Sequence, residues 1–132
     1  MATIVGNDIS SHQGNIDYDT LKKNCNFIFI KSSEGTGFTD PKFLRNRDEA
    51  RRVGLPLGYY HFARPDLGNT AQAEADWFLQ VIGIPQEGEV LCLDYEANWG
   101  GDVVTWSKAF LDRLASRTNG CKALVYLNQS LC

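Results

Sequence analysis

Two acidic residues two positions apart are the part of this sequence best suited to chemistry. Asp94 and Glu96 close an apolar run that begins at Val90. Residues i and i+2 of a β-strand project to the same face, so both carboxyl groups are expected to lie side by side. Neighbouring carboxylates repel, so in a partly dry cleft one keeps its proton while the other stays ionised. The pair is a candidate acid and anion, although two solvated acids at a strand end give the same short pattern.

Other apolar runs also end in polar side chains. In parallel β/α folds the reactive groups collect at the carboxyl ends of the strands. Several such ends in one chain favour a functional site over ordinary loop boundaries, and Asp8 is expected to face a cavity shared with Asp94 and Glu96. The residues concerned are Asp8, Lys31, Glu34 and the run Tyr60, His61 and Phe62.

Aromatic residues lie at or just beyond the same expected strand ends. Flat apolar rings with polar edges suit the faces of sugar rings, although about half of these residues are expected to be ordinary core. The aromatic residues are Tyr59, Tyr60, Phe62, Tyr95, Trp99 and Tyr126.

The elements that must position these residues alternate between strands and helices. Repeated strand–helix alternation predicts right-handed crossovers and a parallel sheet, hence an α/β fold. One helix is expected to begin with Asp40 as its N-cap and to end at Gly54. Strands are expected at 3–8, 27–31, 57–62, 90–95 and 123–127, and helices at 17–24, 41–53, 69–82 and 102–118.

The pattern alone leaves an open doubly wound sheet and a barrel as alternatives. Five strands are too few to close an eight-stranded barrel. No linker or low-complexity segment divides the 132 residues, so a single domain is expected. Ile4, Ile28, Ile30 and Leu124 are expected to face the interior of such a barrel.

Composition argues against several classes of partner. The net charge is −3, and the densest basic cluster, at 45–52, is interleaved with acids, so a nucleic-acid partner is not expected. No run of 18 apolar residues occurs, which predicts no stable membrane association. The N-terminal segment lacks the pattern of a signal peptide, so synthesis in the cytoplasm is expected.

The glycine, histidine and cysteine residues match no cofactor or metal motif. Gly35-Thr36-Gly37 lacks a third glycine, so nucleotide binding is not expected. His12 and His61 are too few and too isolated for a metal site, and a hydrogen-bonded structural role is favoured for both. The cysteines match no Cys-x-x-Cys spacing, and Cys25 and Cys92 are expected to be buried free thiols. No cofactor is therefore expected.

Four ordered motifs together resemble the family-25 glycoside hydrolases, the Chalaropsis-type lysozymes. They cover nearly the whole chain, which is more specific than any one motif alone. The resemblance implies cleavage of the β-1,4 bond between N-acetylmuramic acid and N-acetylglucosamine in bacterial peptidoglycan, with phage endolysins as the most similar-looking members. The motifs are Asp8 to Gly14, Ile30 to Gly35, Gly58 to Phe62 and Leu93 to Glu96, followed by Val125 to Asn128.

The resemblance also implies a fold and a set of roles. Family members fold as an irregular barrel of five strand–helix units with three closing strands, so residues 1–132 are expected to form a catalytic domain that stops after the fifth strand. Glu96 matches the general acid, Asp94 the carboxylate that orients or stabilises, and Asp8 the first-strand aspartate. An N-acetyl-assisted route is favoured over a nucleophilic Asp94. Lys31, Glu34, Tyr60, Phe62, Trp99, Tyr126 and Asn128 are expected to bind substrate.

The sequence is also compatible with two other interpretations. The chain is alternatively a non-catalytic sugar-binding or interaction fragment, active only with a C-terminal partner or through self-association, because an open barrel exposes strand edges. A chitinase-like barrel also ends a strand in Asp-x-Glu, but it would carry an aspartate at position 92, where this chain has Cys92. Peptidoglycan is the expected partner, acted on at the bacterial cell wall.

Overall fold

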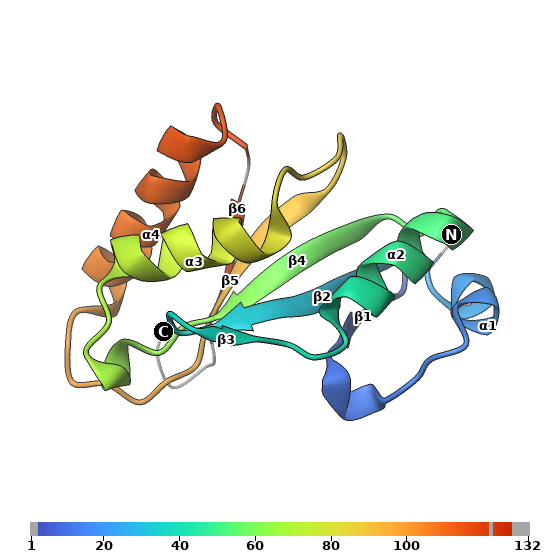
Figure 1. Cartoon of the computed structure of the whole chain (residues 1–132), viewed down its shortest axis with the longest axis horizontal. Helices are drawn as coiled ribbons and strands as arrows, with labels where there is room; N and C mark the ends of the chain where they lie inside the picture. Colours follow the sequence, from blue (N-terminus) through green and yellow to red (C-terminus); the bar gives the residue numbers. More distant parts are fainter. Residues whose placement is uncertain (1–2, 122, 128–132) are drawn as a thin grey trace.

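The computed structural model describes residues 3–121 and 123–127, in which strands and helices alternate as expected (Figure 1). The five predicted strands and four predicted helices are all present, and the short strand β3 was not predicted. The strands are β1 (Gly6–Ile9), β2 (Phe27–Glu34), β3 (Phe38–Thr39), β4 (Leu57–Phe62), β5 (Val90–Tyr95) and β6 (Ala123–Leu127). The helices are α1 (Tyr18–Asn24), α2 (Phe43–Val53), α3 (Ala71–Ile82) and α4 (Val103–Arg117), with short 3-10 turns η1 (Ser11–Gln13) and η2 (Pro65–Leu67).

Five of the strands form a parallel sheet in the order β1-β2-β4-β5-β6, and β3 pairs antiparallel with β2. This confirms the predicted α/β class. β1 and β6 stand at opposite edges of the sheet, yet residues of both line one cavity. The sheet must therefore curl until its two edges face each other across that cavity, which gives a half-barrel rather than a flat doubly wound sheet.

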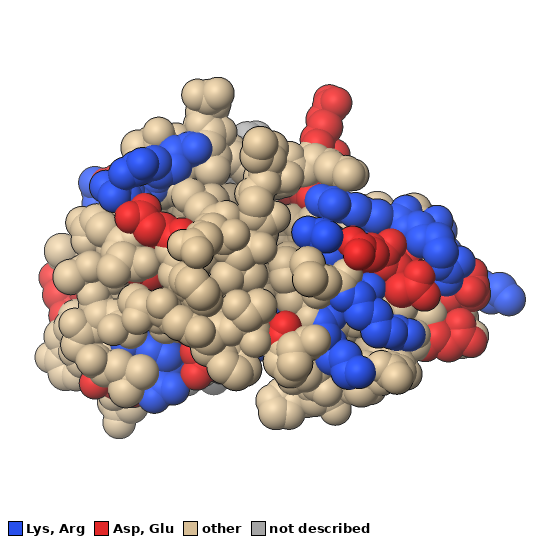
Figure 2. Space-filling model, in the orientation of Figure 1, with Lys and Arg blue, Asp and Glu red and all other residues tan. Residues whose placement is uncertain are grey.

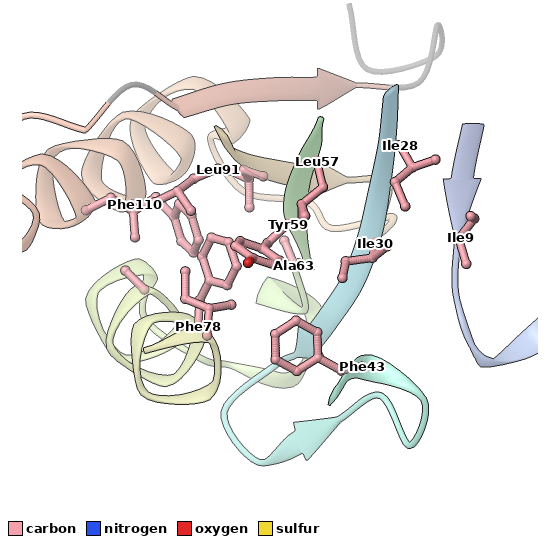
Figure 3. Packing of buried hydrophobic residues seen from close by; sticks show 14 of the residues in the cluster. Ile9, Ile28, Ile30, Phe43, Leu57, Tyr59, Ala63, Phe78, Leu91 and Phe110 are labelled. Atoms are coloured by element: carbon pink, nitrogen blue, oxygen red, sulfur yellow. The ribbon is translucent and has the colours of Figure 1, made fainter. Parts of the chain in front are cut away.

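Alternation along each strand divides the sheet into two faces. The outer face is packed against helices: Leu57, Tyr59 and Leu91 lie toward Phe78 of α3 and Phe110 of α4 (Figure 3). Burying these side chains removes most of their apolar surface from water. Each Å² of apolar surface buried in this way stabilises the fold by roughly 25 cal/mol. The inner face carries the intervening residues, whose side chains are only partly buried or exposed; Gly58, which has no side chain, is buried.

The expected barrel-facing positions of Ile28 and Ile30 are wrong. Both are completely buried in the cluster beneath the helices. Because side chains alternate with a period of two, the same strand turns Phe27, Phe29 and Lys31 to the inner face instead. A continuous apolar run such as this one gives no sign of which parity faces the helices.

Glycines make room for two of these inner rings. A Cβ atom on Gly58 would lie 2.4 Å from the Phe29 ring and 2.8 Å from the carbonyl oxygen of Val90. A Cβ on Gly6 would meet the Phe27 ring at 2.2 Å. The absence of a side chain at 58 therefore lets Phe29 pack across β4.

Helix ends follow the sequence signals, with one correction. Gly54 ends α2 in the left-handed conformation at φ 73°, as predicted. Asp40 is not the N-cap, because α2 begins later, at Phe43. Its carboxylate instead accepts from the backbone N–H of Lys42 at 2.9 Å and of Ser11 at 3.0 Å, which ties the start of α2 to η1.

The basic residues of α2 are interleaved with acidic neighbours, as Figure 2 shows on the right of the molecule. Arg52 pairs with Glu49 and Asp19, and Arg51 with Glu89. Such paired charges describe a solvated helix face rather than a site for an anionic polymer. No helix among the described residues has the length and apolar character needed to cross a bilayer.

A glycine substitution tests the packing of the inner face. Gly58→Ala is expected to destabilise the fold by about 1–3 kcal/mol, because the new methyl group must displace the Phe29 ring and the β5 backbone. Gly37→Ala is the matched control, since no atom lies within 4 Å of its added Cβ, and it should change stability by less than about 0.5 kcal/mol. Thermal unfolding followed by circular dichroism measures both; equal stabilities would contradict this packing.

Candidate active site

A cavity of about 450 Å³ opens on the inner face of the curled sheet. All five parallel strands contribute to its walls, and no helix of the described residues does. The volume lies within the range of sites that take a small ligand or part of a larger one. Its lining residues are Gly6, Asn7, Asp8, Phe27, Phe29, Tyr60, Cys92, Asp94, Glu96, Leu124, Val125 and Tyr126.

Three carboxyl groups line this cavity. Asp8 comes from β1, Asp94 from the carboxyl end of β5, and Glu96 from the residue just past that strand. Asp94 and Glu96 share a face because they stand two residues apart, and the curl of the sheet brings Asp8 to them from a strand that is not their neighbour. This is the arrangement that the strand-end pattern predicts.

The environment of Asp94 favours its protonated form. Burial raises the pKa of its carboxyl group to about 7, and the negative charges of Glu96 and Asp8 add to the rise, while Lys31 opposes it. Asp94 Oδ1 is buried and makes no hydrogen bond to the described residues. Near neutral pH the group is therefore poised between a neutral hydrogen-bond donor and an anion. The family resemblance assigns the transferable proton to Glu96 and the orienting or stabilising carboxylate to Asp94.

Two neighbouring groups respond to the same charges. Burial, with Asp94 and Asp8, raises the pKa of the Cys92 thiol to about 11. Burial also raises the pKa of the Tyr60 hydroxyl, and the surrounding carboxylates raise it further. Both side chains therefore stay neutral at physiological pH, so the negative charge of the cavity resides on its carboxylates.

A second polar group lies on the inner face beyond the cavity wall. Lys31 Nζ is 2.8 Å from Glu34 Oε1, and Arg64 Nη1 is 2.9 Å from Glu34 Oε2. Lys31 also lies over the Phe38 and Phe62 rings, at 5.4 and 5.2 Å from their centroids. Burial raises the pKa of Glu34, but hydrogen bonds from Lys31 and Arg64 outweigh burial and hold it below its ordinary value.

The structure divides the expected substrate contacts into groups. Tyr60 and Tyr126 line the cavity. Lys31, Glu34 and Phe62 do not; they form the polar and aromatic group just described. Trp99 packs partly against the core and lies over Gly101, outside the cavity. Asn128 lies outside the described residues.

Sequence reasoning missed part of the apolar wall. Phe27, Phe29 and Cys92 line the cavity but were not expected to do so, whereas Leu124 faces the interior as expected. The signal was available, because counting back in twos from Asp94 gives Cys92, and from Lys31 gives Phe29 and Phe27. Conversely, Tyr59 and Tyr95 are fully buried on the outer face and belong to the core.

No cluster of three or more potential metal-binding side chains occurs in the described part of the chain. Cys25 is buried and Cys92 half-buried, and neither forms a disulfide within that part. His61 is a buried, hydrogen-bonded residue, as expected.

The raised pKa of Asp94 should make the stability of the fold depend on pH, and replacing Asp94 should remove that dependence. Because the folded-state pKa is raised, the native state loses stability as pH rises from about 4 through about 7. Asp94→Asn removes that loss, so its melting temperature should exceed the parent's by roughly 3 °C or more at pH 8 and by progressively less toward pH 4. Asp112→Asn is the control, because Asp112 is exposed on α4 and pairs only with the exposed Lys108, a contact worth little, so the melting temperature should stay within about 1 °C of the parent's at every pH. A pH-independent difference for Asp94→Asn would contradict the shift.

A family model described as Glycosyl hydrolases family 25 matches residues 7–132. Lysozyme M1 of Streptomyces globisporus is 38% identical over 128 residues, covering 87% of this chain and 43% of the relative. The N,O-diacetylmuramidase of Chalaropsis sp is 33% identical over 145 residues, covering 97% of this chain and 67% of the relative.

A solved structure shares the fold. The crystal structure of the bacterial lysozyme from Streptomyces coelicolor matches with a TM-score of 0.86 at 30% identity, covering 98% of this chain and 65% of that chain. This chain thus spans 43% to 67% of the length of these three proteins. Because the family model matches almost the whole chain and the curled sheet is shared, the chain belongs to family 25 of the glycosyl hydrolases.

Proposed function

We propose that this chain carries the active site of a muramidase, which hydrolyses the β-1,4 bond between N-acetylmuramic acid and N-acetylglucosamine in bacterial peptidoglycan. The observation that carries the proposal is the convergence of three carboxyl groups from β1 and β5 on one cavity, in a member of a glycosyl hydrolase family. Glycoside hydrolysis needs an acid for the leaving oxygen and a second group to stabilise the developing positive charge. The cavity offers both.

Each carboxyl group receives a role. Glu96, in the cavity wall just past the end of β5, is the general acid that protonates the departing oxygen. Asp94 holds the substrate's N-acetyl amide, for which its unbonded Oδ1 and raised pKa suit it as donor or acceptor. Asp8 contributes negative charge from the opposite wall. A proton held on Asp94 in the free site lies on the same face of the sheet as Glu96, in the same cavity.

The remaining side chains on this face are suited to hold the glycan. Tyr60 and Tyr126 present rings beside the carboxylates. Lys31, Glu34 and Phe62 extend the surface toward the carboxyl ends of β2 and β4. Trp99 and Asn128 follow β5 and β6 and are proposed as further contacts. The partner is the peptidoglycan strand, and the place of action is the cell wall.

The roles of Glu96 and Asp94 can be tested with two isosteric variants and two substrates that differ in their leaving group. Glu96→Gln should slow clearing of a cell-wall suspension at least ~10²-fold, because the transferable proton is lost. On a glycoside with an acidic phenol as leaving group, which departs without protonation, Glu96→Gln should retain most of its rate. Asp94→Asn should lose rate on both substrates. If Glu96→Gln clears walls at the parent's rate, Glu96 is not the acid.

A second candidate function is a glycan-binding fragment that cleaves only when a further segment or a second copy completes the cleft. The exposed inner-face side chains near the two sheet edges favour it, among them Phe27, Leu124 and Tyr126. Light scattering should then show self-association. Clearing should require a fragment of a longer family member that carries the segment after the fifth parallel strand. A monomer that clears walls unaided would contradict this second function.

A further inference from the structure

A chain of buried hydrogen bonds crosses the outer face of the sheet, opposite the cavity. Ser33 Oγ of β2 lies 2.8 Å from His61 Nδ1 of β4. His61 Nε2 lies 2.8 Å from Glu74 Oε1 of α3. All three side chains are 0% exposed, and the function proposed above uses none of them.

The order serine, histidine, carboxylate is that of a hydrolytic triad, but here the serine is inaccessible to any substrate. A nucleophilic serine must reach a substrate carbonyl, and Ser33 is fully buried beneath the helices. The His61 ring packs against both Phe78 and Phe110, with ring centroids 5.5 and 5.4 Å away, and these two phenylalanine rings also stack on each other at 6.1 Å. The arrangement therefore holds structure rather than performing chemistry.

The groups around Glu74 indicate which atom donates in each of these hydrogen bonds. Glu74 also accepts from the backbone N–H of Arg64 at 3.1 and 3.2 Å and from Asn69 Nδ2 at 3.1 Å, as an ionised carboxylate does. His61 Nε2 is then the donor to Glu74. Burial lowers the pKa of His61, which favours the neutral ring, so Nδ1 accepts a hydrogen bond from the Ser33 hydroxyl.

Ser33 adjoins an irregularity in β2. Lys31 is in register with Tyr60 and Ser33 with His61, which leaves Ser32 as an extra residue, a β-bulge. Ser32 Oγ donates to the backbone oxygen of Tyr60 at 3.1 Å. Both serines are fully buried, so the inside–outside alternation of the strand is interrupted here.

The bulge changes where Glu34 points. In a regular strand, residues i and i+3 project to opposite faces. With one extra residue between them, Lys31 and Glu34 share the inner face and their charged atoms meet at 2.8 Å. The bulge thus builds the polar group beside the cavity.

We propose that Ser33, His61 and Glu74 are positioning residues, which together hold the Ser32 bulge and so keep Glu34 beside Lys31 on the glycan-facing side of the sheet. We call these three residues the clamp. By holding His61, the clamp also fixes the stretch of β4 that carries its sequence neighbours Tyr60 and Phe62, the two inner-face aromatic residues of that strand. Its effect on glycan binding rests on the function proposed above. Its effect on Glu34 does not.

The clamp can be tested without enzyme activity by titrating Glu34. NMR of the side-chain carboxyl carbon gives its pKa in the parent and in Ser33→Ala. Loss of the hydroxyl should release the bulge, part Glu34 from Lys31 and raise the pKa by roughly half a unit or more. An unchanged Glu34 pKa in folded Ser33→Ala would overturn the proposal.

Two further variants guard this test. Ser107→Ala is the matched control, because Ser107 is also buried but its hydroxyl has no hydrogen-bond partner among the described residues. It should leave the Glu34 pKa unchanged, and an equal rise would show general loosening and overturn the clamp. Ser33→Cys keeps the side-chain size with a poor hydrogen-bonding group. It should raise the Glu34 pKa as well, and it carries the test if Ser33→Ala does not fold.

Activity supplies a separate readout. In wall clearing, Ser33→Ala should raise KM at least threefold with kcat nearly unchanged, because ground-state contacts to the glycan are displaced while Asp94 and Glu96 are untouched. Ser107→Ala should match the parent. If the parent clears no suspension at all, the proposed function fails, and the Glu34 titration alone still decides the clamp.

Discussion

The two-residue period of side chains along a β-strand is the constraint on which this structure depends. Every second side chain of the parallel strands packs against helices, and the burial of these side chains stabilises the sheet. The intervening side chains face inward, where no helix of the described residues covers them. Leu91 and Leu93 are therefore core, while Cys92 and Asp94 on the same strand line the cavity. Shifting a strand by one residue would exchange the two sets and destroy core and site together.

Curvature turns this uncovered face into a site. A flat sheet would keep Asp8 on one edge far from Tyr126 on the other, whereas the curl lets both line one cavity. Small residues at Gly6 and Gly58 let aromatic rings occupy the inner face near the amino ends of the strands. Polar residues follow toward the carboxyl ends, so an apolar floor lies beneath the carboxylates. That floor contributes to the burial that raises the pKa of Asp94.

Much of the fold was predictable because it follows from local pattern. The alternation of strands and helices, the left-handed Gly54 and the shared face of Asp94 and Glu96 all come from short-range rules. The orientation of Ile28 and Ile30 could not be predicted from the apolar run alone, since a strand buried on one side and half-buried on the other reads as uniformly apolar; only the inward position of Lys31 fixes it. The Ser32 bulge depends on partners distant in sequence, His61 and Glu74 among them. β3 was not predicted because a strand of two residues is too short to show an alternating pattern. The cavity wall at Phe27 and Phe29 was predictable in principle once the parity of Lys31 was fixed.

Glycan binding to the inner face is tested most directly by an NMR titration of the chain with a soluble peptidoglycan fragment of alternating N-acetylglucosamine and N-acetylmuramic acid. Backbone amide shifts should move at Asp8, Tyr60 and Asp94 and stay in place at Phe78 and Phe110 on the helix side. Binding by the inner face requires no turnover, so an inactive chain still gives an answer. Shift changes confined to the helices, or none at millimolar fragment, would contradict the assignment of the curled inner face as the glycan site.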